Sequence, residues 1–482
     1  MLKSVRKMST IAPAKILSQK TYKVAGINVF LDMMCGLALT SGAGKLNITE
    51  HFFDVPEDYS KPQGGTIRVF ARSVKKHDTS VIPDTSPDKE QLPWMCYLQG
   101  GPGMECRAPQ HYPWTHTVLD RGYQLLYLDQ RGTGLSTPIT ASTLQSQGNA
   151  EAQAKYLKLY RADSIVKDSE AIRQALTAEY PDEKKKWSIM GQSFGGFCSI
   201  SYLSAHPEGL REAFLFGGLQ PLCSQPDEVY KRLYKKVVER NKAYYAKFPG
   251  DEERVKTIMN YIKRSGDGTV KLPSDGSLTR RRFRQLGIAF GMHGGLDAIH
   301  DVVLRASHDV EAVGHITRGS LSAIDNGTSF DEHLLYAILH EPIYCEGNAP
   351  NWSAHRVMDE FPAFDLDKEE GPILFTGEMI YPWMFEDYSE LRKVQDVANL
   401  VASDSKWSPL FDEQQLVKNE VPVYAASYVD DMYVDFGLSM ETARKIRGCK
   451  VFTTNVMFHD AIRSRMDEVV KQAFALRDDV ID

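Results

Sequence analysis

Residues 187–196 read WSIMGQSFGG, a short apolar strand that runs into the pattern Gly-x-Ser-x-Gly-Gly. A serine hydroxyl is a weak nucleophile unless a base takes its proton and its oxygen stands clear of neighbouring side chains. A sharp turn from strand to helix meets the second need, and glycines are expected beside it because a Cβ would crowd the turn. The stretch therefore predicts a nucleophilic Ser193, although the pentapeptide taken alone is equally typical of an ordinary turn.

The size and composition are those of an ordinary soluble globular protein. The chain has 482 residues, of which 42% are hydrophobic and 25% are charged. This length predicts one large domain with an insertion, or two domains. The net charge of −6 is mild, so it provides no electrostatic basis for binding nucleic acid or an anionic membrane, both of which favour basic surfaces.

The seven cysteines are scattered along the chain, and they include no C-x-x-C pair. The odd number and the spacing favour free thiols in a reducing compartment over a disulfide framework or a zinc site. No stretch of about 20 apolar residues is present to span a bilayer. We therefore expect a cytoplasmic protein with no metal and no cofactor.

Strand patterns and helical patterns alternate in the first half of the chain. Two β-rich runs separated by a Pro/Gly-containing connection predict an antiparallel pair, and the later runs predict buried strands separated by helices. Such alternation predicts a mostly parallel sheet covered on both faces, with its chemistry at the carboxyl ends of the strands. The expected strands are 46–55, 66–74, 93–98, 124–128, the strand before Ser193, and 212–217.

Changes of pattern divide the chain into four parts. Residues 1–44 are expected to form a peripheral arm, and residues 45–222 the first part of the core. Residues 223–365 are rich in Lys, Arg, Glu and Tyr at helical spacing, which predicts an inserted helical lid. Strand patterns at 372–375, 422–427 and 450–454 then place the second part of the core at 366–482, ending in an amphipathic helix.

A nucleophile turn of this kind is followed in the chain by an acid and then by a histidine. One late strand ends in Val429-Asp430-Asp431-Met432, and the next ends in Phe458-His459-Asp460. His459 is the candidate base for the Ser193 proton, and Asp431 is the candidate group that orients the imidazole. Spacing alone does not separate Asp431 from Asp430.

Acyl transfer also requires hydrogen-bond donors for the oxyanion, usually backbone N–H groups. One donor is expected from Phe194, the residue after the nucleophile. The other is expected from the glycine loop Gly100-Gly101-Pro102-Gly103, which directly follows an early strand.

Three segments together resemble the prolyl aminopeptidase (proline iminopeptidase) group of serine peptidases. They are the Gly-Gly-Pro-Gly loop at 100–103, the segment DQRGTGLS at 129–136, and GQSFGG at 191–196. The resemblance implies an α/β-hydrolase fold, in which a mostly parallel central sheet carries an inserted helical lid. It also implies Ser193, Asp431 and His459 as the catalytic triad, and the backbones of Gly101 and Phe194 as the oxyanion hole. Gln99 departs from the pattern, because the family usually has His there.

Members of this family bind the free amino terminus of the substrate with lid glutamates, and a buried secondary ammonium does need carboxylate partners. Two Glu-x-x-Tyr stretches begin at Glu341 and Glu378, and the second continues into the aromatic run Tyr381–Phe385. We expect Glu378 and Glu341 to bind the amine. Glu346 and Glu386 are the reserve candidates.

The sequence thus predicts a serine aminopeptidase that removes N-terminal proline from small peptides through an acyl-enzyme. An aminopeptidase of broader specificity, an esterase, an amidase or a lactonase is the first alternative. A catalytically silent binding protein that uses the same pocket is the second, and the complete triad argues against it. The oligomeric state stays open.

Overall fold

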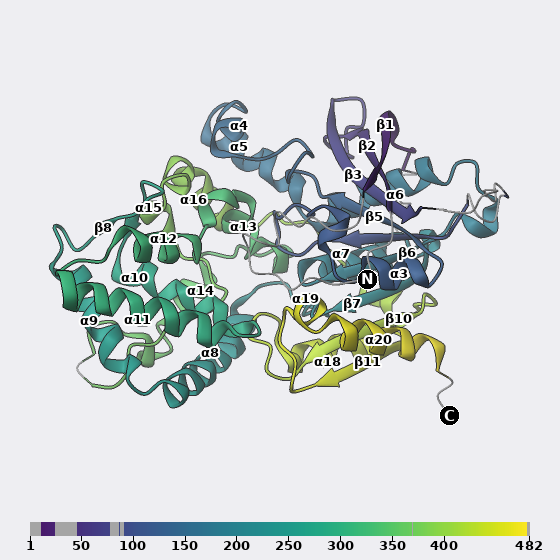
Figure 1. The fold of residues 1–482 in the computed structure, drawn as a ribbon. Helices are drawn as coiled ribbons and strands as arrows, with labels where there is room; N and C mark the ends of the chain where they lie inside the picture. Colours follow the sequence, from purple (N-terminus) through teal and green to yellow (C-terminus); the bar gives the residue numbers. More distant parts are fainter. Residues whose placement is uncertain (1–10, 25–45, 78–85, 87–90, 369, 480–482) are drawn as a thin grey trace.

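The strands assemble into one mixed sheet in the computed structural model, which describes residues 11–24, 46–77, 86, 91–368 and 370–479 (Figure 1). Its strands are β1 (Lys15–Val24), β2 (Leu46–Pro56), β3 (Thr66–Lys76), β4 (Trp94–Leu98), β5 (Gln124–Asp129), β6 (Trp187–Gln192), β7 (Leu210–Phe216), β10 (Val423–Tyr428) and β11 (Cys449–Thr454). In space they follow the order β1-β2-β3-β5-β4-β6-β7-β10-β11.

The sheet is antiparallel at one end and parallel over the rest. The strands β1, β2, β3 and β5 pair antiparallel in that order. From β5 onward every neighbouring pair is parallel. Every residue of β4, β6 and β10 is buried, as expected for parallel strands covered on both faces. The predicted α/β-hydrolase fold with its mostly parallel sheet is confirmed.

Side chains that alternate along the strands enter two separate hydrophobic clusters. On β4, Met95 and Tyr97 belong to the cluster that includes α3 and α20, whereas Cys96 and Leu98 belong to the cluster that includes α6 and α7. The helices of this part are α3 (Thr115–Asp120), α4 (Ala141–Gln145), α5 (Ala150–Leu157), α6 (Ala162–Leu176), α7 (Phe194–Ala205), α18 (Phe436–Lys445), α19 (Ala461–Ser464) and α20 (Met466–Asp478).

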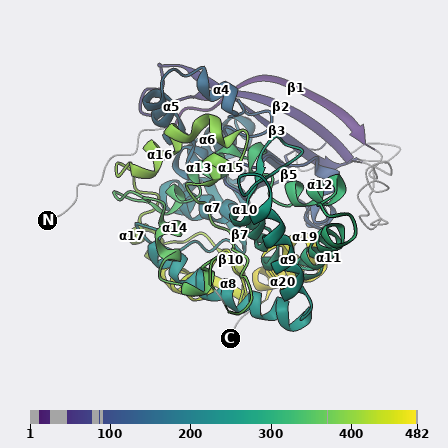
Figure 2. The same cartoon turned by 90° about the vertical axis from the view of Figure 1, so that its left-hand side faces the viewer.

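A group of helices stands at one end of the sheet, and Figure 2 shows these helices in front of the strands. They are α8 (Asp227–Lys247), α9 (Asp251–Arg264), α10 (Arg280–Phe283), α11 (Gly295–Val313), α12 (Arg318–Asn326), α13 (Leu334–Leu339), α14 (Ser353–Met358), α15 (Met384–Asp387) and α16 (Gln395–Ser403). In this part the described strands are the two-residue pair β8 (Val270–Lys271) and β9 (Ser277–Leu278). We use the term lid for this group together with its connections.

The prediction of a strand at 372–375 is wrong. This segment forms hydrogen bonds with side chains and loops of the lid and does not join the sheet. The backbone N–H and C=O of Phe375 bond to the side chain of Asn241, and Thr376 N donates to the carbonyl of Arg284. The helices α15 and α16 follow this segment, and α16 packs against both α5 and α13 before α17 (Glu413–Val417) packs against α7.

The predicted arm at 1–44 lies partly outside the described residues. Its described part contains β1, which pairs with β2 from Lys15 to Val24. Most side chains of β1 are exposed, and this explains why its composition gave no strand signal. Residues 15–24 therefore extend the sheet by one edge strand.

The most specific sequence segment, DQRGTGLS, is held by a buried ion pair. Arg131 donates to both carboxylate oxygens of Asp168 at 2.7 and 2.6 Å, and both side chains are fully buried. The guanidinium also donates to the carbonyls of Pro56, Glu57 and Leu159. Arg131 thus ties the turn after β5 to α6 and to the end of β2, so its role is structural.

Asp168→Asn is expected to lower the free energy of unfolding by about 3–5 kcal/mol, because it leaves a buried guanidinium without its counter-charge. Denaturant unfolding of the variant and of the wild type measures this difference. Asp182→Asn serves as the control, because Asp182 pairs with Lys185 at an exposed site and its loss should leave the midpoint unchanged. Equal midpoints for Asp168→Asn and the wild type would contradict the assignment.

Candidate active site

Ser193 stands on a strained turn between β6 and α7. Its backbone has φ 54° and ψ −124°, values that a residue with a side chain seldom adopts. A Cβ on Gly195 would lie 1.9 Å from the carbonyl oxygen of Leu98, and one on Gly196 would lie 2.4 Å from that of Gly218. The glycines are therefore required by close backbone approach, and the turn has the geometry of a nucleophile elbow.

The glycine loop after β4 lies against this turn. A Cβ on Gly100 would come within 3.1 Å of the Cβ of Ser193. Among the described residues, the N–H groups of Gly101 and Phe194 donate to no other protein atom. In the described residues both groups are therefore unpaired, as the predicted oxyanion hole requires.

Asp431 and His459 meet at the carboxyl ends of β10 and β11. The Nδ1 of His459 lies 2.8 Å from Oδ2 of Asp431, whose Oδ1 accepts from the backbone N–H groups of Tyr433 and Val434. The side chain of Asp431 is 1% exposed, whereas that of Asp430 is 41% exposed and pairs with Lys236. The structure thus separates the two aspartates that spacing left equivalent.

The electrostatic surroundings of His459 favour its charged form. Burial opposes the imidazolium, but the carboxylates of Asp431 and Glu378 outweigh burial and raise the pKa of His459 above its usual value. Since a carboxylate can only accept, Nδ1 carries a proton and Nε2 is the nitrogen available to take another. This is the arrangement expected of a general base.

Ser193 and His459 lie on either side of the turn that follows β7. A Cβ on Gly217 would lie 3.2 Å from Nδ1 of His459, and one on Gly218 would lie 2.7 Å from the carbonyl oxygen of Ser193. No hydrogen bond joins their side chains within the described part of the chain.

Glu378 is a partly buried carboxylate close to this pair. Its Oε1 accepts a hydrogen bond from the hydroxyl of Tyr336 on α13. Burial raises the pKa of Glu378 to about 7, while the nearby His459 and the Tyr336 hydroxyl act in the opposite direction. Glu378 therefore lies near His459 and changes between its neutral and its charged form close to neutral pH.

Comparison with known proteins gives a consistent result. Residues 93–263 match the model of the alpha/beta hydrolase fold family. The chain is 44% identical over 441 residues to the proline iminopeptidase aneH of Aspergillus aculeatus, covering 92% of this chain and 96% of that protein. It is 38% identical over 431 residues to the proline iminopeptidase of Aeromonas sobria, covering 89% and 96%. The chain belongs to the proline iminopeptidase family.

A solved structure of the same name is more distant. The crystal structure of a proline iminopeptidase from Mycobacterium smegmatis is 13% identical, with a TM-score of 0.41 over 88% of this chain and 97% of that chain.

The other glutamates suggested by the resemblance to proline iminopeptidases have different surroundings. Glu341 is buried, and its two oxygens accept from the backbone N–H groups of Ser353 and Ala354 at 3.0 and 2.8 Å. Burial raises the pKa of Glu341 to about 8. Glu346 is half-buried and accepts from Leu410 N, and Glu386 is exposed and pairs with Arg281. Of the four, Glu378 is the carboxylate that lies close enough to His459 to raise its pKa.

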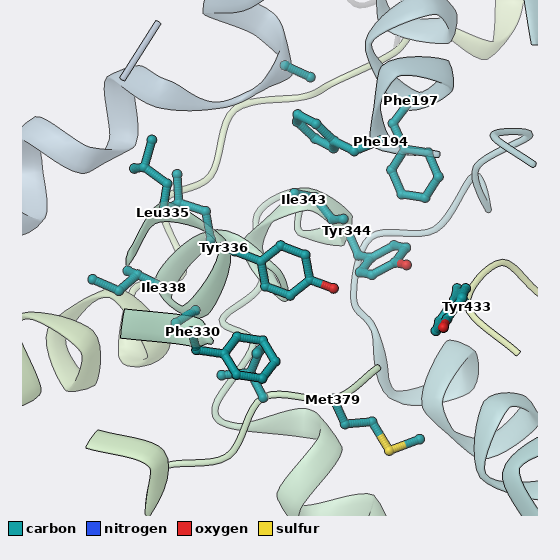
Figure 3. Packing of buried hydrophobic residues seen from close by; sticks show 14 of the residues in the cluster. Phe194, Phe197, Phe330, Leu335, Tyr336, Ile338, Ile343, Tyr344, Met379 and Tyr433 are labelled. Atoms are coloured by element: carbon teal, nitrogen blue, oxygen red, sulfur yellow. The ribbon is translucent and has the colours of Figure 1, made fainter. Parts of the chain in front are cut away.

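Tyr336, Tyr344 and Tyr433 lie near Glu378, and the sequence predicted no role for these three side chains. Figure 3 shows Tyr336 and Tyr344 beside Phe194, Phe197 and Tyr433. The rings of Phe197 and Tyr344 are 5.6 Å apart, and the carboxylates of Glu378 and Asp431 help burial to raise the pKa of Tyr344. The Glu-x-x-Tyr spacing at 341–344 is the sequence signal that could have identified Tyr344, but it was used only to predict a role for Glu341.

Helix α13 covers the glycine loop and the turn after β5. A Cβ on Gly103 would lie 2.7 Å from the Cβ of Leu335, and one on Gly132 would lie 2.5 Å from its Cδ1. These glycines of the sequence motifs are therefore explained by the approach of the lid as well as by the turns themselves.

A second buried serine–histidine pair lies elsewhere in the sheet. The Nε2 of His51 on β2 lies 2.8 Å from Oγ of Ser73 on β3, but its Nδ1 contacts the amide of Gln19 and not a carboxylate. Burial lowers the pKa of His51 to about 4. This pair links three neighbouring strands and lacks the acid that a triad requires.

No helix in the described ranges has the length and apolar character needed to cross a membrane. The same ranges contain no group of three or more His, Cys, Asp or Glu side chains placed to hold a metal ion.

Asp431→Asn is expected to slow the reaction of Ser193 with a fluorophosphonate probe by about 10⁴-fold, because the orienting carboxylate is lost. Asp430→Asn is the matched control and should react at the wild-type rate, since Asp430 contacts solvent and Lys236. Labelling rates followed by mass spectrometry distinguish the two. Equal effects of the two substitutions would show that the wrong aspartate has been identified.

Proposed function

We propose that this protein is a serine aminopeptidase that hydrolyses N-terminal proline from small peptides through an acyl-enzyme. The observation that carries the proposal is the partly buried Glu378 carboxylate, which lies near enough to the Asp431–His459 pair to raise the pKa of His459. A general ester hydrolase has no use for a desolvated negative charge next to its base. A peptidase that recognises a free amino terminus requires one.

In the proposed reaction, Nε2 of His459 takes the proton of Ser193 as Oγ attacks the carbonyl carbon of the substrate. The N–H groups of Gly101 and Phe194 hold the resulting oxyanion. His459 then gives its proton to the departing amine as the C–N bond breaks. A water molecule attacks the acyl-enzyme by the same route, which releases free proline and restores Ser193.

Recognition of the amino terminus is assigned to Glu378. A prolyl amino terminus is a secondary ammonium, with two N–H donors on a compact ring. Its positive charge would stabilise the ionised form of Glu378, so substrate and carboxylate compensate each other for leaving water. The aromatic side chains of Tyr336 and Tyr344 provide apolar walls for the ring.

Glu341 is proposed to act less directly. Both of its oxygens already accept backbone N–H groups, so it has less capacity left for a substrate. The carboxylates of Glu341 and Glu378 nevertheless lie near the same buried Tyr230 hydroxyl, whose pKa they help burial to raise. In its ionised form Glu341 adds to the negative potential that attracts an ammonium group.

Glu378→Gln is expected to raise KM for a proline arylamide by about 100-fold or more, because a charge-assisted contact in a buried site is worth roughly 3 kcal/mol. Hydrolysis of an activated ester that lacks an amine should change little. Glu386→Gln is the control, since Glu386 pairs with Arg281 at the surface. Loss of ester and arylamide hydrolysis to the same degree would favour the esterase or amidase alternative.

The same substitution is expected to move the acid limb of ester hydrolysis to lower pH. His459 must be neutral to act as base, and the Glu378 carboxylate helps to raise its pKa. Removing that charge lowers the pKa of His459, so the base stays neutral to a lower pH. Profiles of kcat/KM against pH for Glu378→Gln and Glu386→Gln measure the displacement. An unchanged or upward limb in Glu378→Gln would argue against coupling of the two side chains.

We further propose a cytoplasmic location and small peptides as substrates. Six cysteines lie in the described residues, and all of them are free thiols, as is typical of a reducing compartment. The lid that covers the glycine loop and surrounds Glu378 favours short chains over folded proteins.

A further inference from the structure

One short lid segment contacts both loops that carry the candidate acid and base. The segment comprises residues 288–293, the end of the 3₁₀ helix η5 (Arg284–Gly291) and the two residues after it. We call it the clamp segment. It lies between α10 and α11 in the chain.

The clamp segment packs closely on the acid loop. A Cβ on Gly291 would lie 2.6 Å from Cγ of Met432 and 2.6 Å from Cζ of Tyr433. The hydroxyl of Tyr433 donates to the carbonyl of Ile288. The residues directly after Asp431 are therefore held by the backbone of the clamp segment.

The same segment bonds to the base loop. The N–H of His459 donates to the carbonyl of Gly291 at 3.3 Å. The carboxylate of Asp460 accepts from the backbone N–H of His293 at 3.0 Å and from its ring Nδ1 at 2.7 Å. The candidate base and its next neighbour are thus tied to two residues of the lid.

Aromatic contacts complete the connection. The ring of His459 meets the ring of Tyr433 edge to face, with centroids 4.6 Å apart. Phe458 lies between His293, whose ring is 5.1 Å away, and the guanidinium of Arg240 on α8, 4.5 Å above its face. Arg240 also donates to the carbonyl of Phe290 at 2.9 Å. The clamp segment is therefore itself fixed to the longest helix of the lid.

His293, Asp460 and Ser464 do not form a second triad. Both Asp460 and Ser464 contact the same nitrogen, Nδ1, whereas a triad histidine bonds the acid and the serine through different nitrogens. The Nε2 of His293 is buried and contacts no hydrogen-bond partner in the described residues. This geometry is that of an anchor.

We propose that the clamp segment is a positioning element for the Asp431–His459 pair, with Gly291 and His293 as its positioning residues. This inference rests on the proposed catalytic use of that pair. The lid then has two roles, since it encloses the substrate and also holds the acid and the base at hydrogen-bonding distance. Displacing the clamp segment would separate them even though neither side chain had been altered.

The first test uses a glycine pair. Gly291→Ala is expected to lower kcat by about 100-fold with little change in KM, because displacement of reacting groups by about 1 Å can have that effect. Gly319→Ala is the matched control on α12, where a Cβ would lie 3.9 Å from its nearest neighbour, Thr317 Oγ1. Wild-type kcat in Gly291→Ala would overturn the proposal, as would a change confined to KM.

The second test uses the anchor. His293→Ala is expected to lower kcat, and His293→Asn should restore most of it because the amide Nδ2 can donate to Asp460 in place of Nδ1. His308→Ala, at an exposed position on α11, is the control. Thermal unfolding is measured for every variant. The proposal would be contradicted if kcat decreased only in proportion to the unfolding temperature and His293→Asn did not restore it. The clamp segment would then contribute only to the stability of the fold.

Fluorophosphonate labelling separates this inference from the proposed function. Labelling of Ser193 requires the aligned acid and base but no amine recognition. If the wild type is labelled yet fails to cleave proline arylamides, the aminopeptidase proposal fails while slow labelling of Gly291→Ala still supports the clamp. If the wild type is not labelled at all, both proposals fail together.

Discussion

The hydrogen bond between Asp431 and His459 is the interaction on which the site depends, and the surrounding fold buries it. A carboxylate that is 1% exposed needs compensation, which comes from two backbone N–H groups and from the imidazole. The parallel strands β10 and β11 bring the two loops to the same edge of the sheet. The lid then covers that edge.

The lid influences the pKa values of groups in the site as well as the access of substrate to it. Glu378 is contributed by the lid, and burial there raises its pKa while its charge helps to raise that of His459. Each group therefore influences the protonation of the other across the boundary between lid and sheet. Contacts on both sides of this boundary, by α13 on the glycine loop and by residues 288–293 on the acid and base loops, make lid and sheet one structural unit around the site.

Much of the fold could be predicted from the sequence, because its signals are local. Apolar runs and glycine turns located the buried strands to within a few residues, and the antiparallel pair β2–β3 formed as expected. The segment at 372–375 misled because its apolar residues are buried against the lid, and a short buried run has the same pattern in a strand or a loop. The sequence did not predict the edge strand β1, because most of its side chains are polar and exposed.

By itself, the sequence determined the family, the elbow around Ser193 and the positions of an acid and a histidine at late strand ends, since each depends on spacing along the chain. The family resemblance implied Asp431, but only the tertiary structure showed that Asp431 is buried against His459 while Asp430 is exposed. Only the tertiary structure also distinguished Glu378 from Glu341 as the carboxylate near the base and showed which lid residues contact the pair. These choices depend on burial and on side-chain direction. Two residues of the same type can lie close together in the sequence and still differ in burial and in side-chain direction. Their three-dimensional surroundings cause this difference, and spacing along the chain does not reveal it.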